Sequence, residues 1–315
     1  MEWVERSFLV KGQEGLGKKP RPELIGPVLT GLHDSLQDAV RMGFLHSSRA
    51  PGRIPDVLKR AAEVRYLGHE GNGDGTLLRF EVSPFGSAAG ELFQQQRLWE
   101  DGPTQNETAF ELFAAVLYDV GSRRADSNRY DPGLLKRIQK YKGTLNRGVQ
   151  RIELPDTNLT QRGHIDADVV SAAFDLAAAT PQPRRVRTTG RLDLMGASQG
   201  VLKIHVQPGE IVTALWDGDV ELEALVEYFN RDVVIEGTAI FRPSGALLRI
   251  DADAIALASS QDELFRAVPT AVVTRDYSRL LRPRPAERPP YVGIVRSIPA
   301  EEPDAEFAAA VDDLS

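Results

Sequence analysis

The 315-residue chain contains no cysteine. Disulfides, thiolate metal sites and cysteine nucleophiles are therefore excluded, and the composition suits the reducing cytoplasm, where we expect the protein. No apolar run approaches the roughly 18 residues of a membrane span, so we expect no membrane association. The charged start, Met1–Arg6, does not fit a signal peptide.

Recognisable catalytic and metal-binding patterns are also missing. The five histidines do not pair at ligand spacing: His33, His46, His69, His164 and His205. No Gly-x-Ser-x-Gly elbow supports a serine nucleophile, and Asp251 and Asp253 fit a solvated strand face. We therefore expect a non-enzymatic protein with no catalytic residues, no metal and no cofactor.

One glycine-rich segment partly matches a phosphate-binding loop. Gly12–Lys18 fits the first seven positions, but Lys19 replaces the serine or threonine that would bind Mg²⁺. Pro20 and Pro22 are expected to prevent a helix from starting there, and an anion site of this kind needs a helix N-terminus. The segment is predicted to be a glycine-rich turn.

The second half of the chain contains five apparent strands, with one helix after the third. The strands are Val186–Leu194, Val201–Val206, Glu210–Trp216, Asp232–Phe241 and Ala246–Ala254, and the helix is Val220–Phe229. This order resembles an OB-type barrel over about Arg185–Leu257. The resemblance implies a fold that holds nucleic acids or saccharides, or serves as a docking surface. It implies no particular ligand residues.

The whole chain is predicted to be α+β. An α+β domain spans 1–180, the OB-like barrel 184–257, a short helical extension 258–281, and a proline-rich linker and docking tail 282–315. In the first domain, Gly26-Pro27 is expected to open a helix, and Asp131-Pro132 to cap another. The loop Gly71–Gly75 is expected to join two strands.

Positive charge is concentrated in one segment of an otherwise acidic chain with a net charge of −7. Arg123–Arg151 contains nine cations against Asp126 and Asp131, with Tyr130 and Tyr141 placed to stack on bases. Lys136, Arg137 and Lys140 are expected to share an exposed helical face. The predicted nucleic-acid-binding residues are Arg123, Arg124, Lys136, Arg137, Lys140, Lys142, Arg187 and Arg191. The alternative interpretation is a solvated helix face.

The C-terminal segment combines an apolar strand, a proline, an acidic cluster and a small amphipathic helix over Val292–Leu314. This arrangement resembles the C-terminal arm of bacterial antitoxins that wrap PIN-domain ribonucleases. The resemblance implies a partner protein, and a PIN-type nuclease is the candidate it suggests. The predicted partner-binding residues are Arg282, Arg284, Arg288, Arg296, Phe307, Val311 and Leu314. A disordered acidic tail is the alternative.

Three hypotheses follow. The first is a non-enzymatic, antitoxin-like or accessory member of a bacterial two-component module that docks a partner through its tail. The second is a nucleic-acid-binding accessory factor using the basic segment and the start of the barrel. The third is an unrecognised enzyme with the Gly71–Gly75 loop at its site. The partner, the kind of nucleic acid and the oligomeric state stay open.

Overall fold

The structure is a computed structural model. It describes residues 2–12, 16–49, 54–73, 75–93, 102–154, 163–196, 200–216 and 222–272. All of these residues belong to one compact unit, 1–272. The fold is α+β, as predicted.

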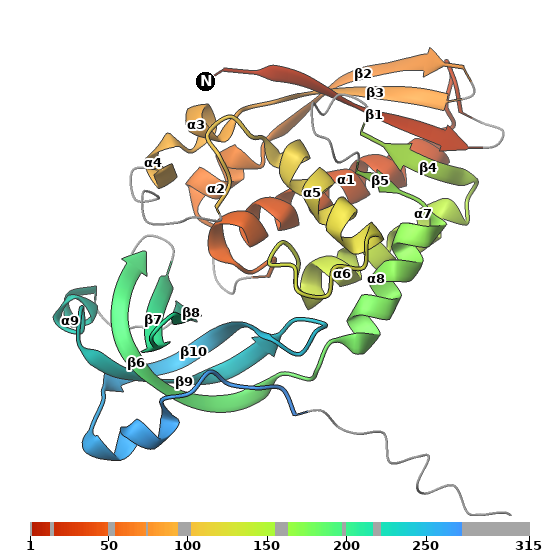
Figure 1. Cartoon of the computed structure of the whole chain (residues 1–315). Helices are drawn as coiled ribbons and strands as arrows, with labels where there is room; N and C mark the ends of the chain where they lie inside the picture. Colours follow the sequence, from red (N-terminus) through yellow and green to blue (C-terminus); the bar gives the residue numbers. More distant parts are fainter. Residues whose placement is uncertain are drawn as a thin grey trace, which may run out of the picture. The chain divides into compact units, whose positions relative to one another are not determined.

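An antiparallel sheet organises the N-terminal region (Figure 1). Its order is β2-β3-β1-β4-β5, and its strands are β1 (Val4–Gly12), β2 (Val64–Asn72), β3 (Gly75–Val82), β4 (Val149–Glu153) and β5 (His164–Ile165). The predicted loop between two strands is the turn from β2 to β3, where Asn72 pairs with Gly75 and Gly73 has a φ of +57°. Glycine adopts this left-handed conformation without steric cost.

Helices cover one face of this sheet (Figure 1). They are α1 (Pro22–Leu45), α2 (Asp56–Ala61), α3 (Phe85–Ala88), α4 (Gly90–Phe93), α5 (Ala109–Gly121), α6 (Pro132–Gln139), α7 (Tyr141–Leu145) and α8 (Ala167–Ala179). The apolar side of α1, which includes Leu32 and Leu36, and Phe110 of α5 share a core with Phe8 of β1. The spacing of apolar residues on α1 and α5 places one side of each helix inward.

Helix α1 begins earlier than the sequence suggested. Its first residue is Pro22, not Gly26 or Pro27. No helix begins at Lys18 or Lys19, as expected, but Pro22 starts a helix three residues after Lys19, so it was wrong to treat this proline as a barrier. The backbone N–H at the first helical position has no partner within the helix, so a proline there sacrifices no hydrogen bond. The φ of proline also suits a helix. Pro27 is accommodated within the helix. A Cβ at Gly12 would collide with the carbonyl oxygen of Gly148, so close packing explains this glycine.

The second sheet is a closed five-stranded barrel. Its strands are β6 (Arg184–Gly196), β7 (Val201–Gln207), β8 (Glu210–Trp216), β9 (Asp232–Phe241) and β10 (Leu247–Leu257), in the order β10-β8-β7-β6-β9. Helix α9 (Leu222–Glu227) lies between β8 and β9 in the chain. Only β8 and β10 pair in parallel. This topology is compatible with an OB-like barrel, so the predicted strand order is confirmed.

Strand β9 is paired on both edges and has buried side chains in the barrel core. It pairs with both β6 and β10, and Val233 and Ile235 are fully buried in the barrel core. The register of β10 shifts between Ala252 and Ala254, opposite Gly237. A Cβ at Gly237 would collide with the carbonyl oxygen of Asp251. The strand pair therefore has a β-bulge at this glycine, with the extra residue carried by β10.

The hairpin from β9 to β10 contacts the helical region. The backbone N–H of Ser244 donates to the carbonyl of Ala125, and Arg242 Nε donates to Asn128 Oδ1 at 2.9 Å. The buried Arg249 donates to the His46 carbonyl at 3.0 Å. These contacts help to make residues 1–272 one compact unit. The finer division at 180–184 stays a prediction.

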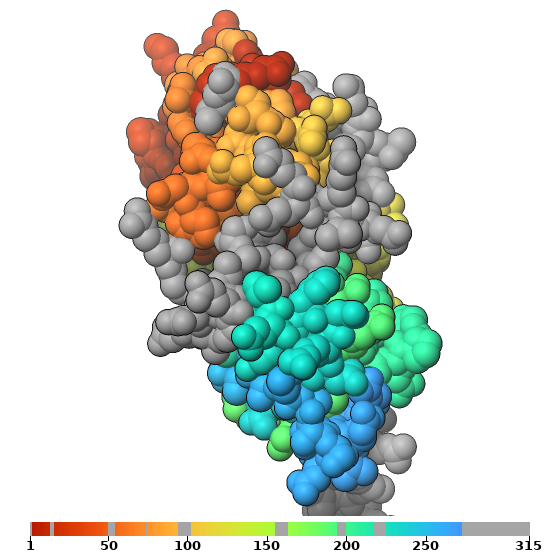
Figure 2. All heavy atoms as spheres, turned by 90° about the vertical axis from the view of Figure 1, so that its left-hand side faces the viewer, coloured from red at the N-terminus to blue at the C-terminus, as the bar shows by residue number. Residues whose placement is uncertain are grey.

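The short helical extension after the barrel is a 3-10 helix, η2 (Ser260–Phe265). Its cap is Ser259, and the hydrogen bonds between Ser259 and Asp262 form a capping box. Figure 2 shows the barrel segments from β8 to η2, turquoise to blue, forming one continuous surface. Within the described part of the chain, no helix combines the length and apolarity needed to cross a membrane.

Candidate functional site

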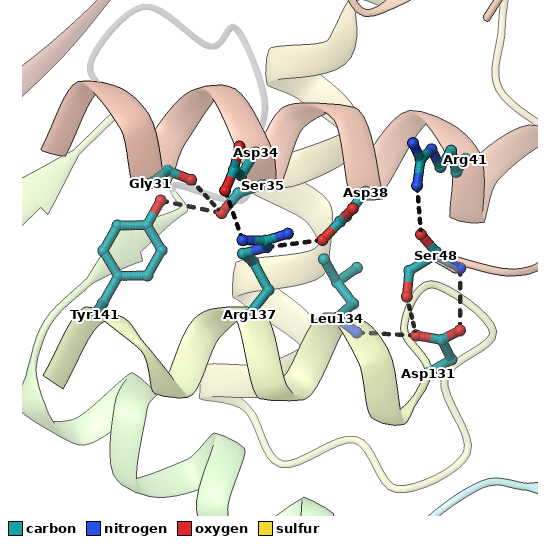
Figure 3. A network of polar contacts seen from close by, with 10 residues as sticks. All are labelled: Gly31, Asp34, Ser35, Asp38, Arg41, Ser48, Asp131, Leu134, Arg137 and Tyr141. Carbon is teal, nitrogen blue, oxygen red and sulfur yellow. Dashed lines mark hydrogen bonds and ion pairs between the residues drawn. The ribbon is translucent and has the colours of Figure 1, made fainter. Parts of the chain in front are cut away.

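Helices α6 and α1 are joined by an arginine clamp (Figure 3). Arg137 Nη1 lies 2.6 Å from Asp34 Oδ2, and its Nε lies 2.8 Å from Asp38 Oδ2. Burial lowers the pKa of Arg137, but the hydrogen bond and charge of Asp38 and the charge of Asp34 leave it raised overall. The expectation that Arg137 projects from an exposed face is therefore wrong, because its side chain is only 20% exposed and is held by two carboxylates of α1.

A second polar cluster fixes the start of α6. The buried carboxylate of Asp131 accepts hydrogen bonds from Leu134 N, Ser48 N and Ser48 Oγ, at 2.9, 3.0 and 2.6 Å. Arg249 Nη1 of the barrel lies 3.3 Å from the same carboxylate. The predicted cap at Asp131 is confirmed. Figure 3 shows Asp131 with Ser48 and Leu134, and the contact with Arg249 connects it to a third part of the chain.

The two tyrosines predicted to stack on bases are both buried. Tyr141 Oη lies 3.0 Å from Ser35 Oγ, which donates to the carbonyl of Gly31 (Figure 3). Tyr130 Oη donates to the Arg124 carbonyl at 2.5 Å, and burial raises the pKa of Tyr130 to about 12. Neither ring face is free to stack on a base, so this expectation is wrong.

A cavity of about 470 Å³ lies between α1 and the α6–α7 segment. Its lining residues are Pro27, Thr30, Gly31, Asp34, Arg137, Lys140, Tyr141, Gly143, Thr144 and Arg147. The lining carries three cations and one carboxylate, so it is positively charged overall. Tyr141 and Thr144 are buried, whereas Lys140 and Arg147 are exposed. The cavity therefore reaches from solvent to the packed surface between the helices.

The predicted basic segment separates into paired and unpaired cations. Arg124 and Arg129 both contact the buried Asp119, and Arg123 pairs with Asp175. Arg151 pairs with Glu153. Four exposed cations have no carboxylate partner within the described part of the chain: Lys136, Lys140, Lys142 and Arg147. Lys142 lies 5.7 Å from the Phe174 ring.

These four cations lie within twelve residues of chain, and we call them the α6–α7 cation set. Two of its members, Lys140 and Arg147, also line the cavity. Three members were among the predicted nucleic-acid contacts, and Arg147 was counted in the segment without being singled out. The structure thus concentrates the unneutralised charge on a smaller surface than the sequence suggested.

The predicted barrel residues have different environments. Arg187 contacts Asp262 and Glu236, and it lies 5.0 Å from the Phe265 ring. Arg191 is exposed and has no hydrogen-bond or ion-pair partner among the described residues. Of the two predicted contacts, only Arg191 keeps its charge available to a ligand.

The predicted tail contacts lie outside the described residues. They are Arg282, Arg284, Arg288, Arg296, Phe307, Val311 and Leu314. Within the described residues there is no cluster of three or more side chains suited to a metal ion.

The α1 side of the cavity was not anticipated from the sequence. Thr30 and Asp34 belong to a helix whose buried apolar residues dominated the sequence pattern. One signal was present, because Asp38 interrupts the inward side of α1 and a buried carboxylate requires a partner. The identity of that partner, 99 residues further along the chain, could not be read from local spacing.

Compared with known proteins, the chain shows no significant match to a family model, a curated protein or a solved structure.

Proposed function

We propose that this protein binds nucleic acid through phosphate contacts made by the α6–α7 cation set, without catalysing a reaction. The observation that carries the proposal is the grouping of Lys136, Lys140, Lys142 and Arg147 without carboxylate partners on two successive helices. Lysine and arginine side chains that neutralise phosphates release condensed counterions, which drives binding. The net charge of −7 opposes binding elsewhere on the surface.

The burial of the nearby tyrosines narrows the binding mode. Proteins that hold single strands without sequence preference combine cations with exposed aromatic platforms. Tyr130 and Tyr141 cannot supply such platforms because both are packed in the core. We therefore expect recognition to be dominated by the phosphate backbone, with weak dependence on base sequence.

The barrel takes a secondary role in this proposal. Arg187 is already held by carboxylates, and the β9–β10 hairpin, a loop that often contacts ligands in OB folds, contacts the helical region instead. Arg191 is the one predicted barrel contact that stays available. The sequence-based hypothesis of a nucleic-acid-binding factor used the whole segment Arg123–Arg151 together with the start of the barrel, and the experiment below separates these two surfaces.

The test compares two charge-reversed variants of equal net charge. Lys140→Glu with Arg147→Glu removes cations from the α6–α7 cation set. Arg191→Glu with Arg231→Glu reverses two exposed cations of the barrel region whose side chains have no ion-pair partner among the described residues. Binding of fluorescein-labelled duplex and single-stranded oligonucleotides is measured by anisotropy at low salt. We expect the first variant to weaken binding by about tenfold or more, and the second by much less.

Equal weakening in both variants would show that binding follows net charge alone and would contradict the proposal. No binding by the wild-type protein would contradict it as well. Far-UV circular dichroism of each variant establishes that the fold is retained.

Docking of a partner protein through the tail is a second proposal, supported by the resemblance of Val292–Leu314 to an antitoxin arm. Deletion of residues 297–315 should abolish capture of a PIN-type nuclease, and so should Phe307→Ala combined with Leu314→Ala. A complex that survives the deletion would contradict this proposal.

A further inference from the structure

We infer that the cavity between α1 and α7 is a nucleotide pocket that accepts one phosphate-bearing nucleotide unit, such as the end of a bound strand. The inference rests on the proposed nucleic-acid binding and assigns a more specific ligand to the same surface. Its basis is the juxtaposition of available hydrogen-bond donors and cations around a cavity larger than a phosphate requires.

The volume points to a ligand larger than an inorganic ion. Small-molecule sites in proteins range from about 300 to 1,000 Å³, and this cavity of about 470 Å³ lies within that range. A single phosphate group on Lys140 and Arg147 would leave most of the space unfilled. A nucleoside monophosphate is the smallest unit of a nucleic acid that uses both the charge and the volume.

Of the three cations that line the cavity, one is paired with carboxylates, and the other two have no such partner among the described residues. Arg137 is already paired with the carboxylates of Asp34 and Asp38, so its charge is compensated within the wall between α1 and α6. Lys140 and Arg147 have no partner among the described residues. An anionic group entering the cavity would therefore be bound by these two side chains, with the charge-assisted hydrogen bonds that phosphate oxygens accept.

Neutral polar groups lie among the same lining residues. The hydroxyl of the buried Thr144 has no hydrogen-bond partner among the described residues, and neither has that of the exposed Thr30. A ligand acceptor can replace the water that otherwise solvates a hydroxyl of this kind. Asp34 adds an acceptor, since its interaction with Arg137 uses one carboxylate oxygen. Ribose hydroxyls and base edges supply both kinds of partner, whereas inorganic phosphate supplies mainly acceptors.

The remaining walls are compact and largely apolar. Pro27, Gly31 and Gly143 line the cavity beside the edge of Tyr141. A Cβ at Gly31 would lie 3.2–3.3 Å from the Tyr141 ring and hydroxyl, so the glycine allows the ring to pack directly against α1. These surfaces can contact the ribose or the base without leaving polar groups unpaired.

The experiment titrates the full-length protein with adenosine, guanosine, cytidine and uridine 5′-monophosphates by isothermal calorimetry. Adenosine and inorganic phosphate serve as the two fragments of the ligand. We expect at least one monophosphate to bind roughly tenfold or more tightly than either fragment, since it uses both sets of contacts. Equal affinity for inorganic phosphate and for all four monophosphates would overturn the nucleotide assignment.

Three variants locate the ligand. Lys140→Gln should weaken monophosphate binding about tenfold, and the isosteric Thr144→Val about fivefold, because each removes one pocket contact. Lys136→Gln is the matched control, since Lys136 belongs to the α6–α7 cation set but does not line the cavity. It should weaken oligonucleotide binding and leave monophosphate affinity unchanged. Loss of monophosphate affinity in the control variant, or none in the pocket variants, would overturn the inference.

The two binding measurements distinguish a failure of the nucleotide pocket from a failure of the proposed function. Oligonucleotide binding without monophosphate binding would overturn the pocket and leave the proposed function standing. Monophosphate binding without oligonucleotide binding would overturn the proposed function and support a small-molecule pocket. Absence of both would overturn both.

Discussion

Replacement of Arg137 by glutamine is expected to destabilise the helical region by about 3 kcal/mol. The Asp38 carboxylate is only 6% exposed, and Arg137 is its hydrogen-bond partner. Removing one partner of a buried ion pair leaves an uncompensated charge, which costs about 3–5 kcal/mol. Because the Arg137 side chain is 20% exposed, we expect a loss of stability at the lower end of this range. The contact with Asp34, which is 37% exposed, adds at most about 1 kcal/mol.

The assay is urea unfolding followed by circular dichroism at 222 nm, for the wild type, Arg137→Gln, Asp38→Asn and the double variant. A double-mutant cycle isolates the coupling between the two side chains, and we expect it to be about 2 kcal/mol. Lys140→Gln is the control, because the exposed Lys140 side chain has no partner within the described part of the chain and should change stability by less than about 0.5 kcal/mol. A loss below about 1 kcal/mol in Arg137→Gln would refute the assignment of the clamp.

Three further outcomes are expected. Asp131→Ala should lower the free energy of unfolding, measured with urea, by about 3 kcal/mol or more. The substitution removes a buried carboxylate that accepts hydrogen bonds from four donors, one of them Arg249. A loss under about 1 kcal/mol would contradict the network. Ile235→Asp should unfold the barrel by burying an unpaired charge, and a melting temperature equal to that of the wild type would contradict the core assignment. Stability should fall as the pH rises from about 10 to about 12, because the pKa of Tyr130 is raised in the folded state and the unfolded state loses its proton first. Tyr130→Phe should remove part of that alkaline decline, and an unchanged decline would contradict the raised pKa.

The parts of the fold that depend on local patterns were predictable. Strand β9 matches its predicted bounds at Asp232–Phe241, since a run of β-branched residues between turn signals defines it. The cap at Asp131 was also predictable, because a side-chain acceptor before proline marks a helix start. The early start of α1 was missed because two prolines were taken as barriers, although one of them occupies the favourable first position.

The candidate site was only partly predictable. The sequence placed the basic segment correctly but could not show which cations meet carboxylates from distant elements, as Arg137 does with Asp34 and Asp38. One local signal was overlooked. Tyr141 continues the buried spacing of Leu134 and Ile138, so the helical period alone indicated that its ring points inward.

The most direct test of the proposed function is the salt dependence of duplex DNA binding in Lys136→Gln, Lys140→Gln, Lys142→Gln and Arg147→Gln combined. On B-DNA, each phosphate contact contributes about 0.9 to the slope of log Kobs against log salt concentration. If all four cations contact phosphates, the combined variant should have a slope shallower than that of the wild type by about 3 to 4. A variant that folds normally and retains the wild-type slope would contradict the account, because the α6–α7 cation set would then make no contact with phosphate.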